Sequence, residues 1–377
     1  MKRITDPRLC TGCTACVNVC PKQCINMVNV NLFSHPEIDE EICINCNLCE
    51  KVCPNNKKLD ANDFKLQYKG VYSKDDEIIK NSSSGGVFSE LATYVLGLNG
   101  IVYGCAFIEG KAKHIGITSI DDLPSLRGSK YVQSEMGNCF LQISNHLKSN
   151  KVVLFVGTGC QIAGLKSYLG KSNNDNLFLI EILCHGVASP VLLDEFLQPY
   201  KNKYGDIESL EFRNKELYGW TPPTLKISFK KKTIKKVFAF TSYGMGFGKG
   251  LFNREVCMNC KYTLESELGD LIIADFWGCE NIKLNKNGTS LVIIKSIKGQ
   301  KILDAIRDKV IMFDSNFEEA SKQNPKLLGP NKKGALSEEE RAFINTSEYS
   351  EICERYNLRI SKIDELKFKI LSIIRRN

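Results

Sequence analysis

The sequence predicts an α+β protein in which a small cysteine-rich module precedes a larger α/β domain and a helical C-terminal extension. Within the first 54 residues, two cysteine runs share one spacing, and from residue 70 apolar runs of strand length alternate with runs of helical pattern. A length of 377 residues also suggests two to three domains. We therefore expect a module at 1–56, a polar linker at 57–69, the main domain at 70–325 and the extension at 326–377.

The two cysteine runs have the spacing of a bacterial two-cluster ferredoxin. Each run has the pattern C-x2-C-x2-C-x3-C followed by proline, and the second begins 33 residues after the first. In such modules three cysteines of one run hold a [4Fe–4S] cluster and the fourth reaches the other cluster. We expect one cluster on Cys10, Cys13, Cys16 and Cys53, and a second on Cys43, Cys46, Cys49 and Cys20. Between the runs, partial alternation of apolar and polar residues over 25–38 predicts a hairpin.

Disulfide bonds and zinc sites fit these runs less well. The start, MKRITDPRLC, lacks the apolar core of a secretory signal, and a disulfide framework requires an oxidising compartment. Zinc sites use pairs of C-x2-C knuckles rather than triplets with a trailing Cys-Pro. Seventeen cysteines without an export signal therefore predict metal ligation in the cytoplasm.

Composition and charge set the class of protein. A hydrophobic content of 43% and a charged content of 25% are ordinary for a globular protein, and no run approaches the length of a membrane span. The net charge of +8 is spread along the chain, and we expect no nucleic-acid partner. A net positive charge of this size would instead attract an acidic protein partner or an anionic cofactor.

The main domain shows a succession of strand and helix patterns. We expect strands at 71–72, 101–107, 112–118, 152–156, 177–183, 271–274 and 291–295, helices at 87–98, 135–147, 162–169, 190–204 and 300–307, and a β-rich stretch at 207–240. This alternation is typical of an α/β or α+β domain.

Two loops of this domain are candidates for a nucleotide. Ser83, Ser84, Gly85 and Gly86 open a helix, where backbone N–H groups and hydroxyls can hold phosphate. The same residues also fit a serine N-cap with a glycine turn. Gly157, Thr158 and Gln161 follow a buried strand, the usual ligand position in an open sheet, although the full G-x-G-x-x-G pattern is absent.

A third group of cysteines lies in the main domain. Cys160 and Cys184 each follow a predicted strand, and Cys257 and Cys260 form a C-x2-C knuckle. A parallel sheet would place the two strand ends side by side, so four thiolates would be available for a further cubane or a zinc ion. Buried structural cysteines fit the spacing equally well. His185, next to Cys184, is a candidate proton donor or a structural histidine.

Several motifs in order along 70–315 support a resemblance to a known family. They are Ser83–Ser89, Arg127–Ser134, Val153–Gln161, Cys184–Pro190, Phe212–Lys215 with Gly219–Trp220, Cys257–Cys260, Gly269–Asp270 and Asp275–Gly278. With these motifs the chain resembles the coenzyme F420 hydrogenase/dehydrogenase beta subunit family with an N-terminal ferredoxin fusion.

The resemblance implies a flavoprotein that holds FAD close to a [4Fe–4S] cluster. The loop 83–86, Lys130, Gly157, Thr158 and Gln161 match segments expected around FAD. Cys160, Cys184, Cys257 and Cys260 match the expected ligands of the domain's own cluster. The family usually has proline where this chain has Gly159, which predicts a more flexible turn here.

We therefore expect an iron-sulfur flavoprotein oxidoreductase that passes electrons between the ferredoxin clusters and FAD. The substrate would be organic, coenzyme F420-like or other, and a redox partner protein would be a ferredoxin or a dehydrogenase or hydrogenase subunit. The alternative is an electron-transfer subunit that docks on a partner oxidoreductase and has no substrate of its own.

The C-terminal stretch 355–377 has apolar residues at helical spacing and several basic residues. We expect a structural helix packed on the protein. Contact with an anionic membrane surface or with the groove of a partner protein is the alternative.

Overall fold

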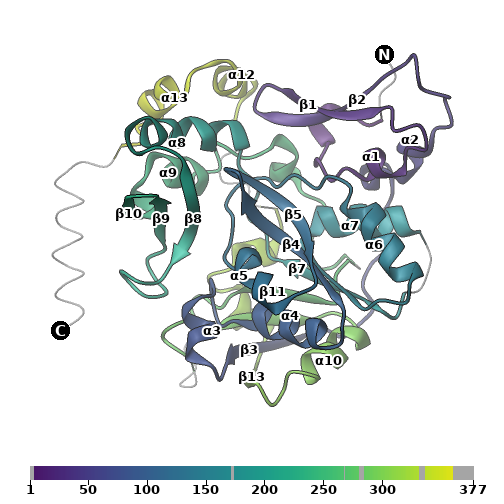
Figure 1. Cartoon of the computed structure of the whole chain (residues 1–377), viewed down its shortest axis with the longest axis vertical. Coiled ribbons are helices and arrows are strands. Elements are labelled where there is room, and N and C mark those ends of the chain that lie inside the picture. The colour runs from purple at the N-terminus through teal and green to yellow at the C-terminus, as the bar shows by residue number, and fades with distance from the viewer. Residues whose placement is uncertain (1–3, 171–173, 267, 280–283, 331–335, 360–377) are drawn as a thin grey trace.

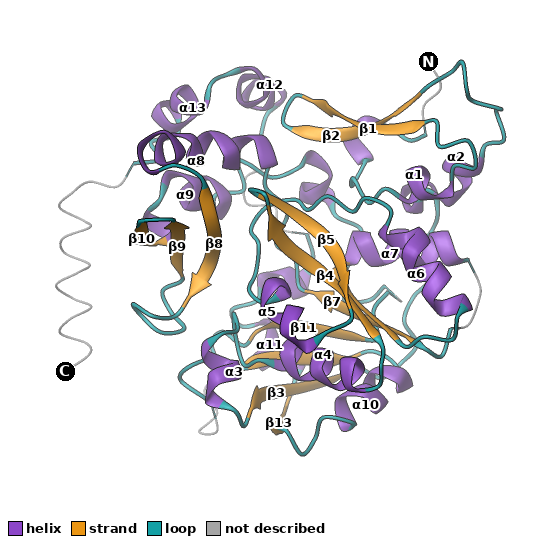
Figure 2. Ribbon diagram, in the orientation of Figure 1, coloured by secondary structure: helices purple, strands orange, loops and turns teal. Residues whose placement is uncertain are grey.

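The computed structural model describes residues 4–170, 174–266, 268–279, 284–330 and 336–359 (Figure 1). These residues form a two-stranded hairpin, a three-stranded sheet and an eight-stranded mixed sheet, with helices around them (Figure 2). The predicted helix in the C-terminal stretch falls largely on 360–377, outside the described residues. Within the described ranges, every helix is too short or too polar to cross a membrane.

The N-terminal module repeats in structure as it does in sequence. Strands β1 (Ile25–Val30) and β2 (Phe33–Ile38) form the predicted antiparallel hairpin, which is confirmed. Helices α1 (Ala15–Val19) and α2 (Leu48–Val52) each begin one residue before the third cysteine of a run, and the fourth cysteine caps each helix end. The residue before each helix has a left-handed backbone, with φ of 62° at Thr14 and 60° at Asn47. The shared cysteine spacing therefore produces the same loop and helix twice.

The large sheet has the strand order β13-β3-β12-β11-β7-β6-β4-β5. Its strands are β3 (Gln67–Ser73), β4 (Ile101–Ile108), β5 (Lys111–Ile117), β6 (Val153–Thr158), β7 (Leu177–Ile182), β11 (Leu271–Asp275), β12 (Ser290–Ile294) and β13 (Val310–Ser315). Strands β4, β6, β7 and β11 pair in parallel, and the antiparallel β12 joins β11 to β3. Strand β3 therefore runs in the same direction as β11, and the carboxyl ends of five strands lie at one edge of the sheet.

Helices cover both faces of the large sheet. Side chains alternate along β6, so Val153 and Phe155 pack in the core under α6 (Cys139–Lys148) and α7 (Gly159–Leu169). Leu154 and Val156 face the opposite core, which contains α4 (Val87–Gly97), α5 (Leu123–Leu126) and α10 (Ile297–Asp304). The continuous apolar run that predicted this strand reflects burial on both faces.

The remaining helices surround the smaller sheet or flank the large one. Strands β8 (Ile207–Asn214), β9 (Thr224–Phe229) and β10 (Lys232–Val237) confirm the β-rich stretch. Residues of α8 (Pro190–Tyr204), α9 (Ser242–Gly248), α12 (Glu338–Thr346) and α13 (Tyr349–Arg355) share a core with this sheet and with Leu32 and Phe33 of the hairpin. The short helices α3 (Asp76–Lys80) and α11 (Phe317–Ser321) follow β3 and β13.

Several predicted first residues of strands and helices are wrong, because pairing with distant strands determines where these elements begin. Strand β3 begins at Gln67, inside the predicted linker, because it pairs with β12 and β13. The linker itself is held to the domain, since Asn62 N–H donates to Glu265 O. The helix predicted from 135 begins at Cys139, because Glu135 pairs with the β5 strand through His114 and Ala112. Strand β13 lies in no predicted element.

Candidate redox site

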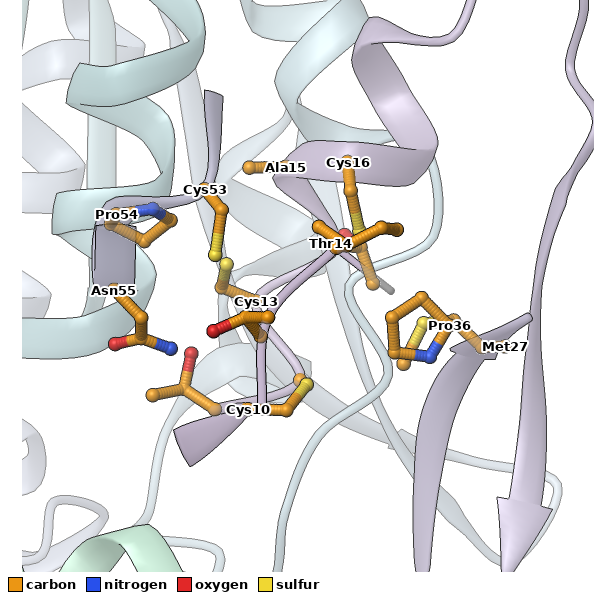
Figure 3. A pocket seen from close by; sticks show the side chains of 14 residues that line it. Cys10, Cys13, Thr14, Ala15, Cys16, Met27, Pro36, Cys53, Pro54 and Asn55 are labelled. Atoms are coloured by element: carbon orange, nitrogen blue, oxygen red, sulfur yellow. The ribbon is translucent and has the colours of Figure 1, made fainter. Parts of the chain in front are cut away.

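The eight cysteines of the two runs line two pockets. Cys10, Cys13, Cys16 and Cys53 line the first pocket, with Asn55 beside them (Figure 3), and Cys20, Cys43, Cys46 and Cys49 line the second. About 340 and 350 Å³ at the two pockets is not filled by protein atoms, and this space includes open solvent. These are the two sets that the spacing predicts, with the fourth cysteine exchanged between runs. Each pocket has the four sulfur donors that fit a cubane, and the ligation itself stays a prediction. Cys24 also lines the second pocket, with its Sγ 3.4 Å from Cys20 Sγ.

The thiols of the first pocket are buried. Burial raises the pKa of Cys13 to about 11, and it also raises the pKa of Cys16 and of Cys53. The thiolate is the form that binds metal, so iron has to displace protons that these thiols hold tightly. Cluster binding at this pocket is therefore coupled to proton release.

The third cysteine group gathers at the carboxyl edge of the large sheet. Strand β6 leads to Cys160 in the first turn of α7, and the parallel β7 leads to Cys184 two residues beyond its end. Cys257 lies in a 3-10 helix, Glu255–Asn259, and Cys260 ends that helix. Val187 O accepts the Arg254 N–H at 3.0 Å, which brings the C-x2-C segment to the chain that follows Cys184.

Burial is the main cause of the pKa shifts of these thiols, and their proximity to one another adds to it. Burial raises the pKa of Cys184 and of Cys257 to about 12, and it raises that of Cys160 further. Next to burial, the charges of other cysteines of the same group raise all three pKa values. Among the described residues, no three His, Cys, Asp or Glu side chains come close enough for a single metal ion. Cluster ligands stand further apart than the ligands of one ion, because the cube lies between them.

Tyr262 and α7 separate the first pocket from the third cysteine group. The buried Tyr262 follows Cys260 by two residues, and its hydroxyl donates to Asn55 Oδ1 at 2.8 Å. Burial raises the Tyr262 pKa, and the nearby thiols Cys160 and Cys13 raise it further. On α7, a methyl group at Gly164 would lie 3.0 Å from Cys13 Sγ. The two cysteine groups are therefore neighbours across one shared wall.

Arg254 fastens the module to the segment that carries Cys257. Its Nε donates to Cys10 O at 2.6 Å, and its Nη2 donates to Ser34 O at 2.9 Å. Its Nη1 donates to Gln133 Oε1 at 2.9 Å, and the whole side chain is buried. Sequence reasoning missed this residue, since a lone arginine three positions before a C-x2-C knuckle has no local signal.

The loop 83–86 lies at the same sheet edge, but its polar groups contact protein. Ser83 Oγ accepts the Ser129 N–H at 2.7 Å. The Ser84 hydroxyl donates to Thr289 O at 2.7 Å, and Gly85 N–H donates to Ser290 Oγ at 3.0 Å. A methyl group at Gly85 would lie 2.4 Å from Val71 O, so packing alone requires glycine there. Gly86, with φ of 87°, is the N-cap of α4.

Lys130 also has protein partners for its ammonium group. Its Nζ donates to the carbonyls of Ser125, Leu126 and Arg127, at the end of α5, at 3.3, 3.1 and 2.7 Å. Burial lowers its pKa to about 8. Lys130 thus caps a helix in this structure, and a phosphate would have to replace those carbonyls.

The predicted turn at 157–161 is divided between strand and helix. Strand β6 continues through Thr158, whose N–H donates to Gln161 Oε1 at 2.9 Å in a capping box for α7. A methyl group at Gly159 would lie 2.7 Å from Glu181 Oε1, and at Gly157 it would lie 2.9 Å from the Phe155 ring. Gly159 is the first residue of α7 and packs closely against its neighbours, and the greater flexibility expected from glycine in place of proline stays a prediction.

A cluster of residues that sequence reasoning left without a role lies at the same edge. Asp275, at the end of β11, accepts two hydrogen bonds from the Arg213 guanidinium, at 2.6 and 3.1 Å. The Trp220 indole N–H donates to Asp275 Oδ1 at 3.0 Å, and its ring stacks on Trp277 with centroids 4.5 Å apart. Arg213 also donates to Ser83 O at 3.0 Å, which joins this cluster to the serine-glycine loop. These residues belong to the motifs that carry the family resemblance, and only that membership could have pointed to them in the sequence.

His185 lies near this cluster. Its ring keeps access to solvent although protein surrounds most of it, and this partial desolvation lowers the imidazole pKa. The charge of Lys326 lowers the pKa further, and Asp275 opposes that effect. An imidazole of lowered pKa is largely uncharged at neutral pH, which fits a structural histidine, and the proton-donor role stays a prediction.

Comparisons with known proteins match the chain in three ranges. Two family models of the "Coenzyme F420 hydrogenase/dehydrogenase, beta subunit" match the main domain, the C-terminal model over residues 150–318 and the N-terminal model over residues 69–140. A 4Fe-4S dicluster domain matches residues 9–57. Curated proteins gave no match.

One similar solved chain comes from a xenon-derivatised F420-reducing [NiFe] hydrogenase complex of Methanosarcina barkeri. It is 17% identical with a TM-score of 0.47, and the alignment covers 79% of this chain and 93% of that chain.

Proposed function

Because this chain belongs to the coenzyme F420 hydrogenase/dehydrogenase beta subunit family, we propose that it is an iron-sulfur flavoprotein oxidoreductase. In this proposal two clusters occupy the module, a third is held by Cys160, Cys184, Cys257 and Cys260, and FAD lies at the carboxyl edge of the large sheet. The substrate is an organic molecule, coenzyme F420-like or other. The observation that carries the proposal is the shared wall of Tyr262 and α7 between the first pocket and the third cysteine group.

The residues of this chain would hold the redox groups close together, and they bury the cysteines of the first pocket. Four cysteines per site fit three cubanes, which supply one-electron chemistry, and FAD would couple single electrons to a two-electron exchange with substrate. Tyr262 fills the space between two of the sites, and its hydroxyl is fixed on Asn55 of the module. Lys261 Nζ donates to Pro54 O at 2.8 Å and to Lys57 O at 2.9 Å, which holds the same wall in place.

The residues predicted to bind FAD would instead hold the backbone at the sheet edge in the shape of the site. Ser83, Ser84 and Lys130 already have protein partners, so they would position the loop and α5 at the edge rather than bind phosphate. Gly157, Gly85 and Gly86 would keep the backbone close-packed there. His185, at the same edge, is the proposed proton donor to substrate.

The test is the iron content of anaerobically purified protein. We expect about twelve iron atoms per chain, at four for each cubane. The variant Cys257→Ser/Cys260→Ser should contain about eight, because the module clusters remain. The control Cys105→Ser/Cys353→Ser should keep the full content. Full iron and an unchanged electron paramagnetic resonance (EPR) spectrum in the first variant would exclude the third cluster.

A second candidate is an electron-transfer subunit without a substrate of its own. The engaged hydroxyl and ammonium groups at the predicted FAD residues favour it. Flavin content separates the two candidates: denatured protein should release about one FAD per chain under the first proposal. Full iron with no flavin would favour the second.

A further inference from the structure

We propose that the surface around the second cysteine pocket is the docking site for a small, basic, one-electron redox protein. The inference deepens the proposed function, but it requires only the second module cluster and neither FAD nor the third cluster. The first observation is that the cysteines of the two pockets differ in their exposure to solvent. Cys46 is exposed, whereas Cys10, Cys13, Cys16 and Cys53 of the first pocket are all buried.

The centre of this surface is apolar. Ile44 and Leu48 line the second pocket and are 57% and 39% exposed, and Ile42 on the same loop is 50% exposed. Large apolar side chains gathered beside an exposed cluster ligand are typical of an interaction site. Encounters between electron-transfer proteins use small interfaces of this kind, because the complex must also dissociate quickly.

The segment 37–50, which carries Cys43, Cys46 and Cys49 of the second pocket, is acidic, and its exposed carboxylates are called the rim below. Residues 37–50 contain five carboxylates and no lysine or arginine, and the five are exposed: Glu37, Asp39, Glu40, Glu41 and Glu50. Lys22 also lines the pocket and Lys51 follows the stretch, so five negative charges face two positive ones, a net charge of −3.

This local charge is opposite in sign to that of the chain, which is +8. A basic partner would therefore be repelled by the chain as a whole and attracted to this surface. At an ionic strength of 0.1 M, charges act over about 10 Å, so such a rim orients a partner at close range.

The sign of the rim also selects among occupants. A second copy of the chain would bring a second acidic rim against the first, and like charges across an interface oppose association. A partner with an apolar contact face inside a basic rim matches both features. The transfer itself moves one electron from the reduced cluster to the partner, with no bond made and no proton moved.

Ferricytochrome c, a small basic haem protein, is a suitable probe. Anaerobically reduced protein is mixed with it in a stopped-flow instrument, and reduction of ferric to ferrous haem is followed at several salt concentrations. We expect the second-order rate constant to fall steeply with salt. The variant Glu37→Lys/Glu41→Lys should lower it about tenfold at low salt and flatten the salt dependence, since rim charges act on the association rate. Ile44→Ser should lower the rate at every salt concentration without changing its salt dependence.

Two matched variants control for general effects. Asp304→Lys/Asp308→Lys makes the same charge change on exposed residues of the α10 region, and Ile297→Ser removes a 67% exposed isoleucine from α10. Both should react at the wild-type rate. Iron content confirms that each variant keeps the module clusters. If the variant Glu37→Lys/Glu41→Lys loses iron, the variant Glu37→Gln/Glu41→Gln replaces it, with half the change in charge.

Equal effects of the rim variant and its control would overturn the proposal, because steering would then follow the net charge. Wild-type rates in both Glu37→Lys/Glu41→Lys and Ile44→Ser would overturn it too. A dimer in sedimentation that Ile44→Ser dissociates would assign the surface to a second copy of the chain. Loss of the third cluster or of flavin, in contrast, would count against the proposed function and leave this result standing.

Discussion

At the residue scale, Thr158 connects the cap of α7 to the third cysteine group. Its hydroxyl lies 3.1 Å from Gln161 Oε1 and 3.2 Å from Cys160 Sγ. The hydroxyl has one hydrogen, and a thiolate sulfur that ligates iron can only accept it. In the cluster-loaded protein we therefore expect the hydroxyl to donate to Cys160.

This hydrogen bond should raise the reduction potential of the third cluster, because it stabilises the more negative, reduced form. A hydrogen bond to a charged acceptor is worth about 1.5 kcal/mol, or about 60 mV for one electron. We expect Thr158→Val to lower the potential by up to about 60 mV and Thr158→Ser to preserve it. A redox titration followed by EPR measures both, and equal potentials in the two variants would contradict the assignment.

Glu181 is a buried carboxyl behind Gly159. Burial raises its pKa from 4.5 to about 7, although Lys295 Nζ, 4.0 Å from Oε2, opposes the shift. The folded state therefore holds a proton that the unfolded state loses above pH 4.5. Stability from this group is present below about pH 4.5 and is lost as the pH rises to about 7.

We expect Glu181→Gln to remove this slope. A pKa raised from 4.5 to about 7 corresponds to about 3 kcal/mol at most, so the variant should gain up to that amount over the wild type between about pH 5 and about pH 8. Urea unfolding at the two pH values measures the gain. If the free energy of unfolding of the two proteins changes with pH in the same way, the pKa of Glu181 is not raised in the folded protein.

At the scale of elements, the segment 254–262 joins the module to the main domain. It begins with Arg254 on two module carbonyls and ends with Lys261 and Tyr262 on residues 54–57. Two cysteines of the third group lie between these anchors. The same short segment thus fixes the module and supplies half of the third sulfur set.

Arg254→Met should loosen this junction. It removes two hydrogen bonds from a buried charged group to the module, and we expect a loss of about 3 kcal/mol. Faster proteolysis at 57–66 and a lower temperature for loss of cluster absorbance are the readouts. Arg341→Met is the control, since Arg341 Nη1 only reaches Asn253 O at 3.5 Å. Equal behaviour of the two variants would contradict the proposed anchor.

At the scale of the whole molecule, the described residues of the module share their hydrophobic clusters with the main domain. One hydrophobic cluster contains Cys13, Cys16 and Cys53 together with Phe155 and Leu179 of the large sheet. A second cluster contains Phe33 of the hairpin and the core of the small sheet. Independent domains usually have their own cores, so this module is part of a larger folding unit.

We therefore expect one cooperative thermal transition in the holoprotein. Visible absorbance from the clusters and far-ultraviolet circular dichroism should be lost together, because unfolding the module exposes the core of the large sheet. Two well-separated transitions, with the clusters lost first, would show that the module unfolds alone.

The sequence by itself determined the features that depend on local spacing. The cysteine spacing predicted the two pocket sets, because one short loop and helix presents three thiols of each set and the two-cluster ferredoxin pattern gives the exchange of the fourth. Buried strands followed from apolar runs, and the predicted parallel neighbours β6 and β7 are confirmed by their register. The grouping of Cys160 and Cys184 followed from that parallel pairing.

Only the tertiary structure decided which polar groups contact one another. Ser84 meets Thr289, Arg213 meets Asp275 and Tyr262 meets Asn55, across 205, 62 and 207 residues of sequence. No local pattern encodes such pairs, because the free energy of a buried hydrogen bond depends on partners that folding brings together. For the same reason, serines and a lysine that resemble phosphate ligands in sequence are engaged by the protein itself.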